Sequence, residues 1–444
     1  MRPVRNLTIP ITLARHVDEP LHEQIAGQVG AAIRDGLLAP RAQLPSTRSL
    51  ATLLGVSRGV AIAAYEVLFA KGCVRGESGS GTFVAGHSCV KAPPPASGQR
   101  TLVDLRPGQP STEAFPLAAW RAAWRRAGFR RPPTEAAPAL GLPQLRRAIS
   151  EHFLGTKGSS CHGKQIVITR GPAHGLTLVL EALGIRGPLV AIEQPCPAWL
   201  WRVAGSPTPL AVDSCGARVD EIPPGCRVAV ISADAQIPYG TVLSPQRRGE
   251  VARWAHETGG FVIEIACDTV FRPELDGLPR LSAMAGARSV LIGGFDELLS
   301  PALRLGYAVV PDELAAEMAS IIERRGEQPE SVGQLAMESM LGDGTVVRLM
   351  HRLGRLYARK RRLVQQTLGG VVAAGTLNSA VIPLPPNANA EQVAAELFER
   401  SIRVETLAPY HFFGQHPQGL VVGYGHVPDA VLERALNTLA IVQQ

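Results

Sequence analysis

Five short apolar runs separated by stretches of helical character constrain the fold of this chain more than any other feature. The runs occupy residues 165–169, 188–193, 227–233, 260–266 and 289–295. Segments with helical patterning, such as 173–184 and 245–259, fall between them. Short apolar runs alternating with helices are typical of a mainly parallel sheet with helices on both faces. The sequence therefore predicts an α/β architecture for this part of the chain.

Changes in composition indicate where this α/β part begins and ends. Residues 90–100 read VKAPPPASGQR, a proline-rich and small-residue composition that stays extended in water. From about residue 342 a long basic helix, VVRLMHRLGRLYARKRRLVQQTLG, is followed by short strands and helices. We predict an N-terminal domain (1–88), a linker (89–102), a large domain (103–340) and a small C-terminal α+β subdomain (341–444).

The first 85 residues carry the pattern of a winged helix-turn-helix. A first helix ends at Gly36 and has apolar residues at helical spacing, namely Leu21, Ile25, Val29 and Ile33. Ser46 or Thr47 is placed to cap a second helix, which Gly55 breaks, and Ser57 can cap a third. Short apolar pieces alternating with glycines then predict a two-stranded wing.

This segment resembles the GntR-type winged helix. The match consists of P-S-x-R-x-L-A-x-x-L-G-V-S-R at residues 45–58, an aromatic residue at Tyr65, and G-x-G-T-F-V at residues 79–84. The resemblance implies that this domain binds double-stranded DNA through an exposed third helix and the wing. A winged helix retained only for protein contact is the alternative.

The resemblance implies specific DNA contacts. The residues concerned are Arg48, Ser57, Arg58, Gly59 and Gly81, with Lys71 and Arg75 as neighbours of phosphates. Family members often have threonine after the Ser-Arg pair, whereas Gly59 and Val60 follow it here. This difference leaves the base preference of the domain undetermined.

The rest of the chain, from about Val103 to the C-terminus, resembles the aminotransferase-like domain of MocR-type regulators. Landmarks of that domain occur in order at residues 106–120, 141–149, 166–176, 191–199, 236–248 and 300–307. The resemblance implies a pyridoxal-phosphate fold. That cofactor requires an amine for a Schiff base, a carboxylate on the ring nitrogen, a hydroxyl, an aromatic face and an anion site.

Several of these groups are replaced in this chain. The family motif G-T-F-S-K aligns on residues 293–297, so Glu297 stands at the position of the lysine, and a carboxylate cannot form a Schiff base. Four further positions depart from the family: Ile265 replaces the ring-nitrogen carboxylate, Cys267 the tyrosine, Pro197 the stacking aromatic residue, and Ala235 the histidine before Gln236. We expect no covalently bound pyridoxal phosphate.

Part of the anion site remains. Arg304 keeps the position that pairs with phosphate in the family, and residues 171–175 can present backbone N–H groups at the start of a helix. Alternatively, Arg304 closes a salt bridge to Glu297 or Asp296. The carboxylate-binding arginine of the family aligns loosely on Val421, and three residues remain candidates to replace it, namely Arg403, Arg202 and His411.

Composition adds weaker restrictions. The formal charge of +7 and the pI near 9.2 fit a nucleic-acid partner. The seven cysteines lack the close spacing of a metal site, so we expect no metal and reduced thiols. No run approaches about 18 apolar residues, and the N-terminus lacks the pattern of a secretion signal. These observations favour a cytoplasmic, nucleoid-associated protein.

Three functions follow as hypotheses. The first is a transcriptional regulator whose catalytically inactive aminotransferase-like domain senses an unidentified small molecule and forms a homodimer that reads two half-sites. The second is an aminotransferase-type enzyme, or a regulator that binds pyridoxal phosphate, through another lysine. The only lysines are Lys71, Lys91, Lys157, Lys164 and Lys360. The third is an interaction protein in which both modules are inert.

Overall fold

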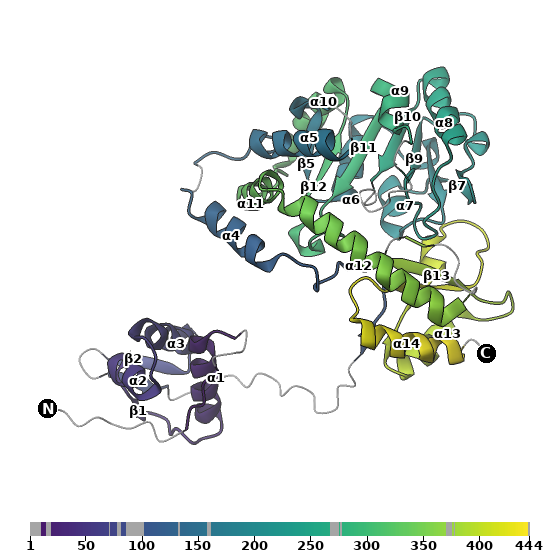
Figure 1. Ribbon diagram of the computed structural model, residues 1–444. Coiled ribbons are helices and arrows are strands. Elements are labelled where there is room, and N and C mark those ends of the chain that lie inside the picture. Colours follow the sequence, from purple (N-terminus) through teal and green to yellow (C-terminus); the bar gives the residue numbers. More distant parts are fainter. Residues whose placement is uncertain are drawn as a thin grey trace. The chain divides into compact units, whose positions relative to one another are not determined.

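The computed structural model describes residues 10–14, 19–70, 72–77, 81–85, 102–131, 134–157, 161–266, 275, 278–369, 375–376 and 378–442. The chain forms two compact units, Met1–Arg100 and Thr101–Gln444. Each unit has its own hydrophobic core and its own set of helices and strands (Figure 1).

The N-terminal unit combines helices with a small antiparallel sheet in the order β1-β3-β2. Its described elements are α1 (Leu21–Arg34), α2 (Thr47–Leu54), α3 (Arg58–Ala70), β1 (Gln43–Leu44), β2 (Val74–Glu77) and β3 (Gly81–Val84). Ile25 and Val29 of α1 pack with Leu50 of α2 and Leu68 of α3 in a fully buried core. This arrangement confirms the predicted winged helix-turn-helix.

Local chemistry determines the turn between α2 and α3. The Ser49 backbone N–H donates to the Ser46 hydroxyl at 3.1 Å, so Ser46 is the cap of α2. Gly55 ends α2 with φ 62°, a left-handed conformation that glycine adopts without steric cost. The Val60 backbone N–H donates to the Ser57 hydroxyl at 3.3 Å where α3 begins. Ser46 and Ser57 therefore cap the starts of α2 and α3, and Gly55 ends α2, as predicted.

The C-terminal unit is built on a large mixed sheet in the order β5-β12-β11-β10-β9-β6-β7-β8. Its strands are β5 (Ile166–Thr169), β6 (Val190–Gln194), β7 (Thr208–Asp213), β8 (Gly216–Ala217), β9 (Val228–Ile231), β10 (Phe261–Ile265), β11 (Ser289–Gly294) and β12 (Gly306–Val309). The pairs from β11 through β10, β9 and β6 to β7 are parallel, whereas β12 is antiparallel to both β11 and β5. All five predicted apolar runs are strands of this sheet.

Helices cover both faces of the sheet, as predicted. Ile166 and Ile168 of β5 belong to one hydrophobic cluster and Val167 to another, because successive residues of a strand face opposite sides. The cluster with Ile166 involves α4 (Leu117–Gly128), α5 (Pro143–Lys157), α11 (Ser331–Gly342) and α12 (Thr345–Leu368). The cluster with Val167 involves α6 (Pro172–Ala182), α7 (Ala198–Ala204) and α10 (Asp312–Arg325).

The C-terminal part forms a small α+β subdomain around an antiparallel sheet in the order β13-β16-β15. Its elements are β13 (Ser379–Pro383), α13 (Ala390–Glu399), β14 (Ile402–Arg403), β15 (Glu405–Thr406), β16 (Gly419–Gly423) and α14 (Asp429–Val442). The long helix α12 connects it to the large sheet (Figure 1). One detail differs from the predicted boundaries: β4 (Val103–Asp104) pairs with β14, so the segment at residue 103 packs with the small subdomain.

Several general expectations can be compared with the structure. Cys73 is disulfide-bonded, so the expectation of reduced thiols is wrong at that residue. Among the described residues, the free cysteines are Cys161, Cys196, Cys215 and Cys226. Within the described ranges no His, Cys, Asp or Glu cluster suits a metal ion. In the same ranges no single helix is long and apolar enough to cross a membrane, although α2 and α3 together meet that test as a pair bent by 117°.

A buried arginine fixes the loop that follows β9. Arg248 lies on α8 (Pro245–Thr258) and is 1% exposed. Its guanidinium donates to Asp234 at 2.7 Å and to the backbone carbonyls of Ala233, Leu243 and Pro279 at 2.9–3.1 Å. Because Ala233, Asp234 and Leu243 are buried, removing the guanidinium takes this donor from buried carbonyls and leaves the Asp234 carboxylate with Arg280 at 3.0 Å as its ion-pair partner.

We predict that Arg248→Ala lowers the free energy of unfolding of the C-terminal unit by about 3–5 kcal/mol, the usual cost of breaking a buried ion pair. Urea titration followed by tryptophan fluorescence measures this unit, because all five tryptophans lie within it. Arg253→Ala on the exposed face of α8 is the matched control and should change stability by less than about 0.5 kcal/mol. Equal urea midpoints for Arg248→Ala and Arg253→Ala would contradict the stabilising role of the buried Arg248 guanidinium.

Candidate DNA-binding surface and ligand cavity

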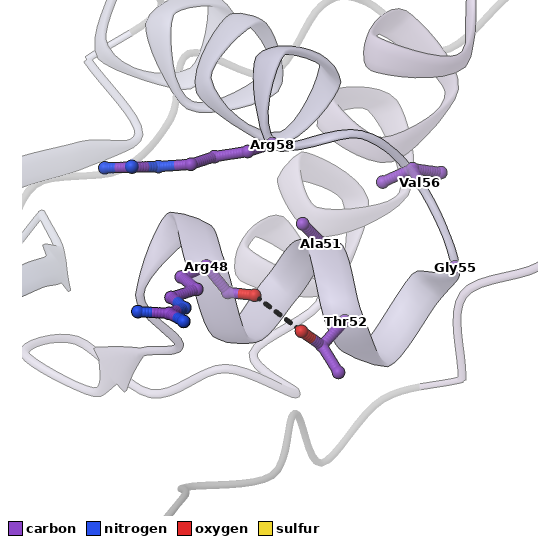
Figure 2. A pocket seen from close by; sticks show the side chains of 6 residues that line it. All are labelled: Arg48, Ala51, Thr52, Gly55, Val56 and Arg58. Atoms are coloured by element: carbon purple, nitrogen blue, oxygen red, sulfur yellow. Dashed lines mark hydrogen bonds between the residues drawn. The ribbon is translucent and has the colours of Figure 1, made fainter.

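Two arginines meet at the helix-turn-helix of the N-terminal unit. Arg48 of α2 and Arg58 at the start of α3 are both exposed and line an open pocket of about 460 Å³. Figure 2 shows the two side chains extending from different helices toward the same side. The remaining lining residues are Ala51, Thr52, Gly55 and Val56. Two guanidinium groups on one exposed face can pair with phosphates or with guanine edges.

The other predicted DNA contacts lie on the same unit. Ser57 and Gly59 are exposed at the start of α3, and Arg75 is exposed on β2. Gly81 begins β3 with φ 116°, and a Cβ there would lie 2.9 Å from the Gln43 side chain, so the wing requires glycine at this position. Lys71 lies outside the described residues.

Val60 explains the departure from the family pattern after the Ser-Arg pair. Its side chain is partly buried and packs against the hydrophobic core of the N-terminal unit. Where family members often have a threonine hydroxyl, Val60 has a methyl group, and its packing helps to hold α3 against the core. At the start of α3, the exposed polar side chains that can contact DNA are therefore those of Ser57 and Arg58.

The C-terminal unit contains a cavity of about 440 Å³ at the edge of the sheet where the parallel strands end. Open α/β sheets bind ligands at this edge, beyond the carboxyl ends of the strands. The lining residues come from the ends of β5, β6, β9, β10 and β11 and the loops that follow them: Arg170, Gly171, Pro172, Ala173, Pro197, Trp199, Ala235, Ile237, Ile265, Ala266, Gly294, Asp296, Glu297, Pro301 and Arg304. The small subdomain, α12 and the start of the unit supply the rest: Pro107, Gly108, Tyr357, Thr376, Asn378, Ser379, Glu405 and Tyr410.

Most of the residues that the sequence assigned to a degenerate cofactor site meet in this cavity. Glu297 follows β11, Ile265 ends β10, and Pro197 precedes α7, and all three line it. Gln236 does not line it. The Gln236 amide is buried and donates to the backbone carbonyls of Pro195 and Ile237, which holds the loop after β9. Cys267 lies outside the described residues.

A carboxylate of the protein lies next to the predicted anion site. Gly171 has φ 96° and precedes the first turn of α6, where helix N–H groups favour negative charge. The Asp296 Oδ2 atom lies 3.3 Å from where a Cβ on Gly171 would stand. The Asp296 Oδ1 atom is buried and has no hydrogen-bond partner within the described chain. A phosphate at this helix would therefore meet the Asp296 carboxylate.

Arg304 does not neutralise these acids by direct contact. It is exposed, has φ 48°, and forms no ion pair within 4.0 Å with Asp296 or Glu297. The alternative of a structural salt bridge is therefore not seen. At longer range Arg304 lowers the pKa of Asp296, but burial has the larger effect and raises that pKa to about 6.

The structure adds cavity residues that sequence reasoning missed. The Tyr410 hydroxyl donates to the Glu405 carboxylate at 2.8 Å, and burial together with that carboxylate raises the Tyr410 pKa. Tyr357 reaches the cavity from α12, and its hydroxyl accepts a hydrogen bond from the Ser111 backbone N–H at 3.3 Å. No short motif marks these residues, because they come from segments far apart in the sequence.

The candidate residues for binding a substrate carboxylate do not line this cavity. Val421 is fully buried in β16, and neither it nor any of the three proposed substitutes lines the cavity. Arg403 lies over the Phe398 ring and Arg202 over the Trp201 ring. Burial lowers the pKa of His411 to about 4.

The chemistry of the cavity does not fit pyridoxal phosphate. Its described lining contains no lysine, and the residue that the family resemblance aligns with the ring-nitrogen carboxylate is the apolar Ile265. The three carboxyl groups that line it are Asp296, Glu297 and Glu405. The arrangement suits non-covalent binding of a small molecule between acidic, aromatic and amide groups.

Comparison with known proteins supports both resemblances. Residues 21–84 match the family described as "Bacterial regulatory proteins, gntR family". The chain is 31% identical to the HTH-type pyridoxine biosynthesis transcriptional regulator PdxR of Corynebacterium glutamicum, over 97% of this chain and 98% of that protein. It is 25% identical to the probable rhizopine catabolism regulatory protein MocR of Rhizobium meliloti, over 97% of this chain and 95% of that protein.

A solved structure shows the same fold in the C-terminal unit. An archaeal alanine:glyoxylate aminotransferase superposes with a TM-score of 0.71 and covers 77% of this chain and 90% of its own. The sequence identity is 18%, so this likeness establishes the architecture alone.

We predict a pH-dependent effect of Asp296→Asn on stability. The Asp296 pKa of about 6 in the folded protein exceeds the usual aspartate value of 3.8, so wild-type stability falls as pH rises from about 4 to about 6 and then levels off. An asparagine at this position does not titrate, so the Asp296→Asn variant does not lose stability in this way. The urea midpoint of the variant minus that of wild type should therefore rise between about pH 4 and pH 6 and stay constant at higher pH. A midpoint difference that is the same at pH 4 and pH 7.5 would refute a raised Asp296 pKa.

Proposed function

The chain belongs to the MocR type of GntR-family transcriptional regulators with an aminotransferase-like domain, and on that premise we propose that this domain senses a small molecule without a Schiff base. The winged helix reads DNA through Arg48 and Arg58. The aminotransferase-like domain binds the effector in the cavity and has no catalytic turnover. In this proposal ligand binding alters DNA affinity through a coupling free energy between the two sites.

One observation carries the proposal: Glu297 lines the cavity directly after β11, at the position that aligns with the family's lysine. A carboxylate has no nitrogen for an imine, so the aldehyde of pyridoxal phosphate has no covalent partner there. Ile265 and Pro197 line the same cavity, so the replacements are gathered at one site. Their clustering supports a change of ligand.

The alternative of another Schiff-base lysine has little support from the structure. Lys360 is 1% exposed, donates to the Val427 backbone carbonyl, and lies 3.7 Å from the Asp429 carboxylate. It is not among the residues that line the cavity. Lys164 is exposed in the short turn before β5. The Lys157 side chain and residues Lys71 and Lys91 lie outside the described part.

We further propose a homodimer, as implied by the resemblance to this scaffold. Two winged helices related by two-fold symmetry would read two half-sites of one operator. The relative from Corynebacterium glutamicum is named for pyridoxine biosynthesis. The carboxylates Asp296 and Glu297 in the cavity support a different effector for this chain.

We predict that the purified protein shows no visible aldimine band after mixing with pyridoxal phosphate, and no pyridoxyl adduct by intact mass after subsequent reduction with borohydride. Glu297→Lys is the matched variant, because it restores an amine at the same position, and it should gain a borohydride-stable adduct. Labelling of the wild-type protein on any of its five lysines would overturn the proposal.

We predict that Arg58→Ala reduces discrimination between a genomic fragment selected by the wild-type protein and a mixed-sequence duplex. A bidentate contact to guanine contributes about 1–3 kcal/mol, so the affinity ratio should fall roughly 5- to 150-fold. Arg75→Ala should weaken binding to both duplexes by the same factor, as loss of a phosphate contact does. Equal weakening on both duplexes by Arg58→Ala would show that Arg58 contacts phosphate.

A further inference from the structure

The positive charge of this chain is concentrated in one helix. Helix α12 contains six arginines and one lysine and no aspartate or glutamate. The other 38 basic residues of the chain are matched by 38 acidic residues, so α12 accounts for the formal charge of +7. Neither the DNA-reading helix nor the ligand cavity uses this charge.

Five of the arginines form a stripe along the exposed side of α12. The arginine stripe consists of Arg348, Arg352, Arg355, Arg359 and Arg362, all of which are exposed. Their spacing alternates between four and three residues, which places them on one face of a helix. The opposite face is apolar and buried, with Leu349, Leu353 and Leu356 in the core of the unit. Packing therefore fixes the direction in which the stripe points.

The protein neutralises only part of the stripe. Arg359 lies 3.0 Å from the Asp429 carboxylate, and Arg348 lies 3.9 Å from the Asp343 carboxylate. Arg352 donates to the Ala114 backbone carbonyl at 3.2 Å. Within the described ranges, Arg355 and Arg362 form no ion pair and no side-chain hydrogen bond. These two guanidinium groups keep all their donors available.

A run of like charges at this spacing destabilises a helix in isolation. Selection for stability alone favours alternating charges on an exposed helix face, whereas this face carries one sign. An external polyanion would remove the repulsion and use the free donors. Arginine suits phosphate in particular, because its planar fork pairs with two oxygens at once.

We propose that the arginine stripe is a second DNA-binding surface, which contacts the phosphate backbone without reading sequence. From Arg348 to Arg362 the helix rises about 21 Å, which corresponds to roughly six phosphates along one strand of B-DNA. Once the winged helix of the same chain has bound a duplex, that duplex is present at a high effective concentration for the arginine stripe. The inference rests on the DNA-binding role of the family and goes beyond the winged helix.

The test measures the salt dependence of DNA binding with the full-length protein. Anisotropy of a labelled mixed-sequence duplex is followed from about 50 to 200 mM salt, where the slope of log K against log salt counts phosphate contacts. Each lost contact lowers that slope by about 0.9. The double variant Arg355→Gln/Arg362→Gln should therefore reduce the slope by about 1.8 and weaken binding over this salt range.

The matched control is Arg253→Gln/Arg400→Gln, two exposed arginines on α8 and at the end of α13. It makes the same change in net charge away from the stripe, and its slope should equal that of wild type. Equal losses in both double variants would indicate a general charge effect and overturn the proposal. A slope in the stripe variant equal to that of wild type would also overturn the proposal.

Two further readouts separate the remaining explanations. If the stripe variant keeps the wild-type slope but changes its mass by light scattering, the stripe contacts a second copy of the chain, and the DNA proposal is wrong. The wild-type unfolding midpoint should be retained, because both side chains are exposed and unpaired in the described structure. Wild-type protein that binds no duplex would reject the DNA-reading function itself, whereas a wild-type slope in the variant rejects only the stripe.

Discussion

Parallel strands bring their carboxyl ends to one edge of a sheet, and this constraint decides which residues of the C-terminal unit meet. The loops after β5, β6, β9, β10 and β11 all leave that edge, and antiparallel β12 begins there. Side chains from residue 170 to residue 304 therefore surround one cavity. Because strand ends set their positions, replacing one side chain changes the chemistry of the cavity while the architecture stays the same.

The replacements change the electrostatic character of the cavity. In the family that the chain resembles, the site provides an amine for an aldehyde and an anion site for its phosphate. Here Glu297, which we propose takes the place of that amine, lines the cavity, and the Asp296 carboxylate lies against Gly171 at the start of α6. Burial raises the Asp296 pKa to about 6, so the group is mostly charged at neutral pH despite its poor solvation. A regulator needs differential binding and no turnover, so such a cavity is compatible with its role.

Charge is also distributed unevenly over the surface. The basic residues of α12 equal the formal net charge of the chain, and five arginines share one exposed face. The buried side of the same helix carries Tyr357 to the ligand cavity. One element thus borders both the proposed effector site and the proposed DNA-binding stripe. A ligand that shifts α12 would act on both, which is the kind of shared two-state element that coupling requires.

The sequence alone determined five strands of the large sheet, the ends of α2 and the residue types at the candidate ligand site. Apolar runs predicted five strands, Ser46 and Gly55 predicted the ends of α2, and Glu297 was evident from its motif, because these signals act between neighbours in the chain. Only the tertiary structure decided that Glu405, Tyr410 and Tyr357 join the cavity and that Gln236 turns its amide to the loop. It also decided that β4 pairs with β14. These contacts connect distant segments or depend on how a loop packs, and no local propensity encodes either.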